Sequence, residues 1–317
     1  MNLPRRAKLL TTLGALFLAT IPAGATADPP AAGQRVRVAA ISFVPRKLDL
    51  PGNADRLEQA FRQATAGGAK IAVAPEGALD GYVVNQMLAG EIPVARMHDV
   101  ALPVDHAVIQ RFQTLAKALE LCLVFGFAEK VSADVFNTAV FIDGAGAIRG
   151  KYRKMQFAEG YHPGWWFNRL GAQSRAFDTP FGRCGILICN DRWNPALARI
   201  PALDGAQFLV IPSFGSKSES QDEAVLSRAR ENGLPVIEAN VGVSLIVSEG
   251  NVAVVQREPE SIAFADIVIP APLASKPAER DEEERKFLAW RAGEMQRRYE
   301  SKYHRFGRTG GQPGEAK

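Results

Sequence analysis

The chain alternates short apolar runs with longer amphipathic segments along most of its length. Apolar runs bounded by Gly, Pro or polar residues predict strands at 36–43, 71–74, 121–127, 138–142, 185–188, 208–211, 236–239 and 252–256. Apolar positions at helical spacing predict helices at 54–66, 104–119, 195–203 and 221–232. This alternation is typical of a layered α/β or α+β fold. No compositional break separates residues 34 and 270, so we expect one domain.

The first residues have the pattern of a secretory signal peptide. Arg5, Arg6 and Lys8 precede an apolar run over 9–21, and small residues follow up to Ala27. We therefore predict a signal peptide at 1–27, cleavage near Ala27, and export of the mature chain to the periplasm or out of the cell. The Arg5-Arg6 pair leaves Sec and twin-arginine export both open. The main domain is then expected over 28–277.

Charge density rises in the last segment, 278–317. Acidic residues 281–284 come first, and Arg297, Arg298 and Lys302 come near the end, an order that suits the helix dipole. The pattern predicts a charged helix over 279–303, followed by a disordered tail. Two interpretations of the helix stay open: a solvated helix laid on its own domain, or an arm that packs on a second subunit.

Composition and charge narrow the class of protein. Hydrophobic residues make up 47% of the chain and charged residues 23%, as in an ordinary globular protein. Without the three cations of the leader, 35 of the 38 basic residues remain against 34 acidic ones, a formal charge of +1. That balance gives no support for nucleic-acid binding. The leader run is too short for a membrane span and no later run is long enough without charges, so we expect no stable membrane anchor.

Several chemistries find no matching pattern in the sequence. The cysteines, Cys122, Cys184 and Cys189, are too few for a disulfide scaffold. Neither they nor the four histidines have the spacing of a zinc site, and we expect no metal or cofactor. The chain has neither the G-x-S-x-G elbow of serine hydrolases nor the G-x-x-x-x-G-K-[ST] phosphate loop. Other side chains must therefore carry the chemistry.

Three reactive groups follow apolar strands, where rigid scaffolds often place catalytic residues. Glu76 comes after 71–74, and a partly desolvated carboxylate there can act as a base, although a helix cap or ion pair is the alternative. Lys154 ends a basic tetrapeptide, which by itself is usually a solvated face. Cys189 ends a strand before polar residues, where backbone N–H groups and a helix N-terminus favour the thiolate.

The residues around these three groups resemble the nitrilase superfamily of carbon-nitrogen hydrolases, from about residue 36 to about 268. The matching segments are Pro75-Glu76 with Gly81-Tyr82, Phe136-Asn137-Thr138-Ala139-Val140, Tyr152-Arg153-Lys154, Ile188-Cys189-Asn190-Asp191-Arg192, Ile211-Pro212-Ser213, Arg228 to Asn232, and Glu238-Ala239-Asn240. The resemblance implies a four-layer αββα sandwich. It also implies a homodimer or higher homo-oligomer that pairs through helices, and a Glu-Lys-Cys triad that needs no metal.

The resemblance implies a role for each member of the triad. Cys189 would attack an amide or nitrile carbon and form a covalent thioester or thioimidate. Glu76 would take the thiol proton, deliver it to the departing amine and then activate water. Lys154 and the backbone N–H of Asn190 would stabilise the oxyanion.

The tripeptide Asn190-Asp191-Arg192 bears on the substrate. It is similar to the amidase and N-carbamoyl amino acid amidohydrolase branch, whereas true nitrilases usually have tryptophan-glutamate after the nucleophile. In that branch Arg192 would hold a substrate carboxylate; equally, it would pair with Asp191 or another neighbouring carboxylate. We expect a small-molecule amide or carbamoyl substrate. A true nitrilase and a catalytically silent amide-binding protein are the alternatives.

The chain departs from the family pattern after Lys154. Many members carry a second glutamate before an aromatic stretch, and here that position falls near His162-Pro163. Glu159 is the nearest substitute, either as a functional replacement or as a loop carboxylate without a role. Trp165, in the aromatic stretch, would line the pocket or pack at the base of a loop. These departures indicate a divergent branch with an altered substrate or, alternatively, lost activity.

Overall fold

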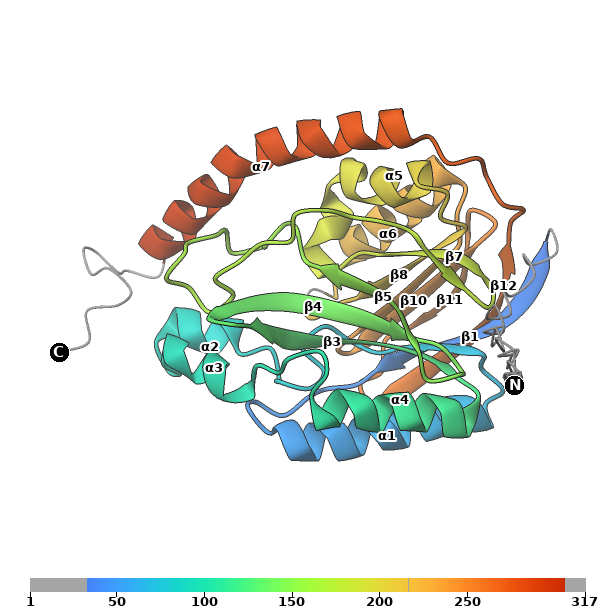
Figure 1. Ribbon diagram of the computed structural model, residues 1–317, viewed down its shortest axis with the longest axis horizontal. Helices are drawn as coiled ribbons and strands as arrows, with labels where there is room; N and C mark the ends of the chain where they lie inside the picture. The colour runs from blue at the N-terminus through green and yellow to red at the C-terminus, as the bar shows by residue number, and fades with distance from the viewer. Residues whose placement is uncertain (1–32, 216, 306–317) are drawn as a thin grey trace, which may run out of the picture.

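The computed structural model describes residues 33–215 and 217–305, which form four layers (Figure 1). Two sheets lie face to face. Helices α1 (Leu50–Ala66) and α4 (Ala107–Leu119) cover one sheet, and α5 (Pro195–Leu203) and α6 (Glu219–Asn232) cover the other. The predicted αββα sandwich is therefore confirmed. The predicted signal peptide and the predicted tail beyond residue 305 lie outside the described residues.

Within these residues, the first sheet has six strands in the order β12-β1-β2-β3-β4-β5. Its strands are β1 Gln34–Ser42, β2 Ile71–Val73, β3 Cys122–Val131, β4 Asp134–Ile142, β5 Ile148–Arg153 and β12 Ser261–Ile269. The three strands β1, β2 and β3 are parallel neighbours, whereas β4, β5 and β12 pair antiparallel. The loops that follow β2 and β5 therefore both start from strands of this sheet.

The second sheet, over the same described ranges, also has six strands, in the order β11-β10-β9-β8-β7-β6. Its strands are β6 Phe177–Thr179, β7 Gly182–Ile186, β8 Phe208–Pro212, β9 Val236–Asn240, β10 Val243–Ser248 and β11 Asn251–Gln256. Parallel pairing joins β7 to β8 and β8 to β9. Every residue of β8 and β9 is buried, as expected for strands with the partner sheet on one face and helices on the other.

Shorter elements occupy the loops. They are α2 Val84–Ala89, the 3-10 turn η1 Val94–Arg96, α3 Met97–Val100 and the 3-10 turn η2 Cys189–Trp193. Two residues, Leu187 and Ile188, separate the last of these from β7. None of the helices in the described part of the chain is long and apolar enough to cross a membrane.

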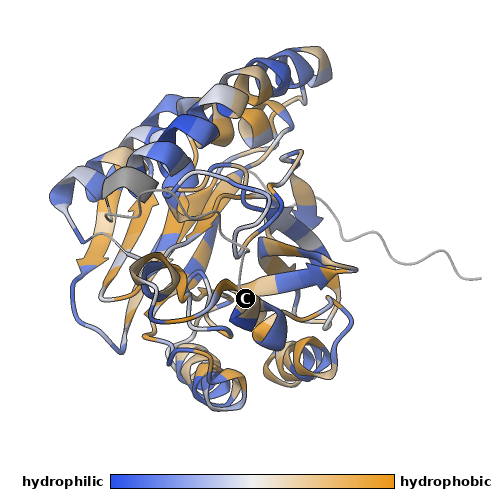
Figure 2. Cartoon of the chain, turned by 90° about the vertical axis from the view of Figure 1, so that its left-hand side faces the viewer, coloured by the Kyte–Doolittle hydropathy of each residue, from blue (hydrophilic) through white to orange (hydrophobic). Residues whose placement is uncertain are grey.

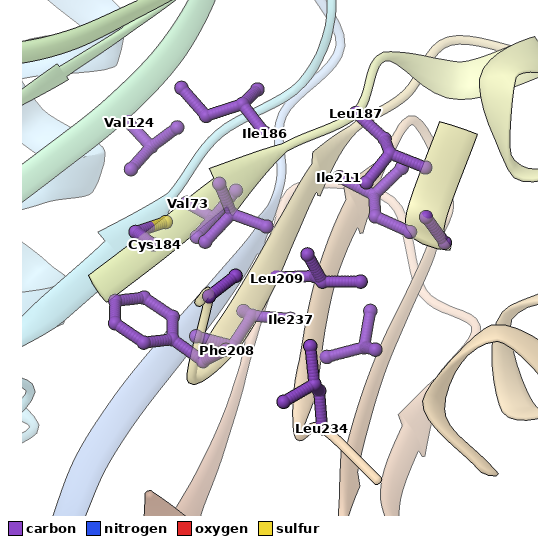
Figure 3. Close-up of a cluster of buried hydrophobic side chains, with 14 of the residues drawn as sticks. Val73, Val124, Cys184, Ile186, Leu187, Phe208, Leu209, Ile211, Leu234 and Ile237 are labelled. Atoms are coloured by element: carbon purple, nitrogen blue, oxygen red, sulfur yellow. The ribbon is translucent and has the colours of Figure 1, made fainter. Parts of the chain in front are cut away.

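Apolar side chains from both sheets form the central core. Val73 and Val124 of the first sheet gather with Cys184, Ile186 and Phe208 of the second (Figure 3). Hydrophobic residues concentrate on the strands, while the outer surfaces of the helices are largely hydrophilic (Figure 2). Burying this apolar surface stabilises the sandwich and fixes the strand ends from which the site loops leave.

The C-terminal helix α7 (Pro277–Arg305) lies across its own domain, over α5 (Figure 1). The Glu284 carboxylate accepts a hydrogen bond from the Arg175 guanidinium at 2.7 Å, and Arg291 Nη1 donates to the carbonyl of Gly171 at 2.6 Å. Phe287 and Met295 turn inward and are buried. These contacts match the first of the two interpretations of this helix, in which it lies on its own domain.

Candidate active site

Loops from both sheets, together with α7, line a cavity of about 210 Å³. Tyr82 reaches it from the loop after β2, Glu159 from the loop after β5, and Cys189 from the start of η2. Asn190, Arg192 and Lys302 complete its polar and charged wall, with the amides of Asn85 and Gln221. The sandwich thus brings residues distant in sequence to one polar pocket.

Glu76 is held in place by both backbone and side-chain contacts. The loop that carries it passes close to β3, where a Cβ added at Gly126 would lie only 2.7 Å from Glu76 Cα. Its Oε1 accepts hydrogen bonds from Lys154 Nζ and from Asn137 Nδ2, both at 2.6 Å. Its Oε2 is buried and has no hydrogen-bond partner within the described residues. One oxygen of the carboxylate is therefore anchored, and the other meets no donor among the described residues.

Lys154 follows β5 and is buried beside Glu76. Its backbone N–H donates to the carbonyl of Asn137 at 2.8 Å, which continues the pairing between β4 and β5. Burial alone lowers the pKa of the Lys154 ammonium, but Glu76 and the other acidic groups nearby outweigh burial and raise this pKa above its ordinary value. The raised pKa favours the charged ammonium, in a water-poor place where charges interact more strongly than in water.

Cys189 stands at a sharp change of backbone direction. Its φ of 48° lies in the left-handed region, which is strained for a residue with a side chain. The thiol donates a weak hydrogen bond to the carbonyl of Phe214 at 3.6 Å. Burial and then the charge of Glu76 raise the pKa of the thiol, while Lys154 and Arg192 lower it. On balance these surroundings hold the pKa of the thiol above its ordinary value, which favours the protonated sulfur.

Asp191 ties the turn that carries Cys189 to the loop after Lys154. Its Oδ2 accepts from the backbone N–H of Ile188 and from the Tyr152 hydroxyl, both at 2.9 Å. Its Oδ1 accepts from the backbone N–H of Gln156 at 3.0 Å. Burial raises the pKa of Asp191 to about 6, although Lys154 and these hydrogen bonds favour the ionised form. One carboxylate thus joins the end of β7 to the segment that follows Lys154.

Glu159 lies in the cavity wall close to the triad. The side chain is buried, and the indole Nε1 of Trp166 donates to its Oε1 at a long 3.4 Å. Burial raises the pKa of Glu159, Lys154 lowers it, and Glu76 raises it further. Glu159 therefore lies within electrostatic reach of Lys154 and Glu76. His162, near the position that aligns with the family's second glutamate, instead stacks on Tyr299 of α7 at 4.9 Å.

Trp165 does not line the cavity. It packs instead against Trp166, with ring centroids 3.7 Å apart, and against Tyr299 of α7 at 4.9 Å. These contacts are those of the packing alternative, and substrate binding by Trp165 stays a prediction. The physical reason for the packing is the docking of α7, which covers this indole from outside.

Arg192 is held by protein groups on all three of its nitrogens. Nη1 forms a buried ion pair with Glu238 of β9, Nη2 donates to Ser213 Oγ at 3.0 Å, and Nε donates to the carbonyl of Cys189 at 2.6 Å. Of the two interpretations of Arg192, the structure shows pairing with a neighbouring carboxylate. The guanidinium braces the turn that carries Cys189, and its charge is compensated within the protein by Glu238.

Two further residues at the site received no role from the sequence. Asn137 anchors Glu76, as described above, and Tyr82 lies with its ring 5.7 Å from Lys154 Nζ. Both belong to segments that resemble the family. Each lies after or within a buried strand, and that position is the feature of the sequence from which a place at the site can be predicted. No group of three or more His, Cys, Asp or Glu side chains with metal-binding geometry occurs in residues 33–215 and 217–305.

Cys189, Lys154 and Glu76 lie at the strand ends of an αββα sandwich. This arrangement is typical of one class of α/β enzymes, those that hydrolyse amides. Within that class, the chain belongs to the carbon-nitrogen hydrolase family, whose sequence profile matches residues 37–270. The chain thus carries the family's domain over most of its length.

Curated relatives carry related names. An N-carbamoylputrescine amidase of Oryza sativa subsp. japonica is 31% identical over 217 residues, which cover 68% of this chain and 69% of the relative. A citrullinase of Francisella tularensis is 29% identical over 219 residues, or 65% of this chain and 73% of the relative.

Solved structures share the fold. An amidase from Nesterenkonia sp. superposes with a TM-score of 0.62 at 22% identity, covering 83% of this chain and all of the amidase (100%). The C. elegans NitFhit protein gives a TM-score of 0.63 at 22% identity, over 82% of this chain and 65% of NitFhit. These likenesses concern the arrangement of sheets and helices.

Proposed function

We propose that this protein hydrolyses the C–N bond of a linear amide or an N-carbamoyl group through a covalent thioester on Cys189. The observation that carries the proposal is the state of Glu76. One carboxylate oxygen is fixed by Lys154 and Asn137, and the other is buried without a partner in the described residues. A buried, unpartnered carboxylate oxygen is costly, and a substrate or thiol proton would satisfy it.

The first half of the reaction transfers the acyl group. Cys189 Sγ attacks the carbonyl carbon while the thiol proton passes to Glu76. The oxyanion of the tetrahedral intermediate is stabilised by the Lys154 ammonium and by the backbone N–H of Asn190 in the first turn of η2. When the C–N bond breaks, Glu76 returns the proton to the nitrogen, ammonia leaves, and the thioester remains.

The second half releases the product. Glu76 takes a proton from water, whose oxygen attacks the thioester carbon. The C–S bond then breaks, and the proton held by Glu76 restores the thiol. The sum is one amide and one water converted into one carboxylic acid and one ammonia. With an N-carbamoyl substrate the acid is a carbamic acid, which loses carbon dioxide to leave an amine.

The names of the relatives support amides and carbamoyl compounds as the substrate class. The matches at 31% and 29% identity are named as an amidase of a carbamoyl amine and a citrullinase. Relatives named bifunctional nitrilase/nitrile hydratase are 27% identical and are covered over a smaller share of their length, 57%. Amide and carbamoyl hydrolysis is therefore the proposed activity, and nitrile hydrolysis is an alternative outcome of the test.

Ammonia release by the mature protein tests the proposal. The panel comprises aliphatic amides, N-carbamoyl amino acids and nitriles, each with wild type, Cys189→Ala and Cys184→Ala. The last variant is the matched control, because Cys184 is a buried core thiol. We expect release from amides or carbamoyl compounds, loss of it in Cys189→Ala, and retention in Cys184→Ala.

The other outcomes have fixed meanings. Release from nitriles alone indicates a nitrilase. Binding of amides with no turnover by folded protein indicates a silent member of the fold. Undiminished turnover in Cys189→Ala overturns the thioester mechanism. A mass increase on the Cys189 peptide after acid quenching, equal to the acyl group, identifies the intermediate directly.

A further inference from the structure

The C-terminal helix contributes a charged residue to the pocket. Lys302, near the end of α7, lines the same cavity as Cys189 and Glu159. It is half-buried and forms no salt bridge with a carboxylate of the described residues, although its charge acts on Glu159 in the same cavity wall. Nothing in the charged sequence of α7 singles this lysine out from the other cations of the helix.

Contacts along α7 attach to the body the part of the helix that precedes Lys302. The backbone N–H of Tyr161 donates to the carbonyl of Met295 at 3.0 Å, and Arg291 Nη1 donates to the carbonyls of Met155 and Gly171 at 3.3 and 2.6 Å. A Cβ added at Gly160 would lie 2.5 Å from the Met295 oxygen, so loop and helix are in close backbone contact. The last turns of α7 are thus attached to the loop that carries Glu159.

The charges in the cavity wall and behind it differ in how they are compensated. Arg192 is neutralised by its buried ion pair with Glu238. Three cations interact with the charge of Glu159. Lys154 and Lys302 each act to lower the pKa of Glu159. Glu159 in turn acts to raise the pKa of Arg298 of α7, which is itself paired with Glu294 at 2.5 Å. Glu76 and Asp191 are compensated by Lys154 and by hydrogen bonds. Of the cations that line the cavity, only Lys302 lacks an ion-paired carboxylate in the described residues.

We propose that Lys302 is a specificity-determining residue, which selects substrates whose end remote from the scissile C–N bond carries a negative charge. This inference rests on the proposed function and adds the substrate's charge to it. An ammonium without a salt bridge at a half-buried site attracts a carboxylate and repels an amine. A carbamoyl or amide compound ending in a carboxylate is then preferred over one ending in an ammonium group.

Alkylation of the nucleophile tests the selection without requiring turnover. Iodoacetate and iodoacetamide differ in charge but react alike: sulfur forms a bond to the methylene carbon, iodide leaves, and the thiol proton passes to Glu76. The measured quantity is the rate with iodoacetate divided by the rate with iodoacetamide, followed on the Cys189 peptide, with Cys189→Ser as background. Wild type is compared with Lys302→Met, Lys302→Arg and Lys286→Met.

Lys286 is the matched control, because it lies on the same helix, is exposed and pairs with Glu282. We expect Lys302→Met to lower the ratio by roughly five-fold, the effect of about one modest ion pair, and Lys302→Arg to restore it. Lys286→Met should leave the ratio unchanged. An equal ratio in wild type and Lys302→Met overturns the proposal, and so does an equal fall in Lys286→Met, which would show a general field effect.

Turnover separates this inference from the proposed function. If hydrolysis is found, Lys302→Met should lower kcat/KM for a carboxylate-ended carbamoyl compound and raise it for the amine-ended compound of equal length. A shifted alkylation ratio without any hydrolysis would support the charge selection and contradict the proposed reaction. Hydrolysis with unchanged preferences would support the reaction and overturn the role of Lys302.

Discussion

Lys154 Nζ lies 2.6 Å from Oε1 of Glu76, and neither side chain has any solvent-exposed surface. Removing two charges from water costs several kcal/mol per ion, and their attraction repays this only with excellent geometry and further hydrogen bonds. Asn137 provides one such bond to the same oxygen. The pair is therefore weak evidence for stability, and its presence in a water-poor site fits the role proposed for it in the reaction.

Removing one member of this pair should cost more stability than removing both charges. In Lys154→Met the Glu76 carboxylate stays buried without its cation, and we expect a loss of about 3–5 kcal/mol in the free energy of unfolding. The double variant Glu76→Gln/Lys154→Met should recover most of that loss while remaining inactive. Urea unfolding and ammonia release measure the two effects. A double variant as unstable as the single one would contradict this account of the pair.

Asp191 should make the stability depend on pH. Its pKa, raised by burial from 3.8 to about 6, means that the folded state holds a proton which the unfolded state has already released. Between about pH 4 and pH 6 this group therefore lowers the free energy of unfolding as pH rises, by on the order of 3 kcal/mol.

The variant Asp191→Asn cannot titrate, so it isolates this contribution. The unfolding free energy of wild type minus that of Asp191→Asn should fall as pH rises through this window and level off above it. Denaturant unfolding at pH 4.5, 5.5 and 7.5 measures the difference. A pH-independent difference would show that Asp191 does not change protonation on unfolding there.

Glu159→Gln should distinguish a working carboxylate from an idle one. Glutamine keeps the shape and the acceptor for Trp166 but removes the charge near Lys154. If Glu159 positions substrate and base, kcat should fall by about 10², the typical effect of misplacing a reacting group, with little change in unfolding free energy. Glu91→Gln, at an exposed loop carboxylate, is the control. A wild-type kcat in Glu159→Gln would leave Glu159 without a role.

Much of the fold could be predicted because burial leaves a strong trace in the sequence. The buried parallel strands β8 and β9 are continuous apolar runs, and α5 was predicted with its observed bounds. β12 was not predicted, because its edge position leaves a mixed pattern of buried and half-exposed residues. β10 is also absent from the predicted strands, although its residues 243–247 are buried.

The site shows where sequence reasoning stops. Residues next to a strand end, such as Glu76 and Cys189, can be recognised because the local pattern changes abruptly there. Partners set by tertiary packing cannot: Glu238 reaches Arg192 through the pairing of β9 with β8, and Trp165 is covered by α7. Lys302 enters the pocket only because the whole helix is docked, and helix spacing does not encode that contact.

Adding even a methyl group at Gly160 should therefore disturb the pocket from a distance. Gly160 has φ 88°, and an added Cβ would meet backbone atoms of Met295 and Tyr299, so Gly160→Ala must push α7 away from the loop. Gly233→Ala is the matched control, because its φ of 65° imposes similar backbone strain, about 1–2 kcal/mol, while nothing lies within 4 Å of the new Cβ.

We expect both glycine variants to lose stability, and only Gly160→Ala to lose activity as well. Displacing α7 moves Lys302 and loosens the loop of Glu159, so kcat/KM for a carboxylate-ended substrate should fall more than that for a neutral one. Protection of the Tyr161 amide, which donates to Met295, reports the displacement by hydrogen exchange. If the two variants match in activity and in protection of that amide, α7 does not hold the loop, and the pocket is assembled by the sandwich alone.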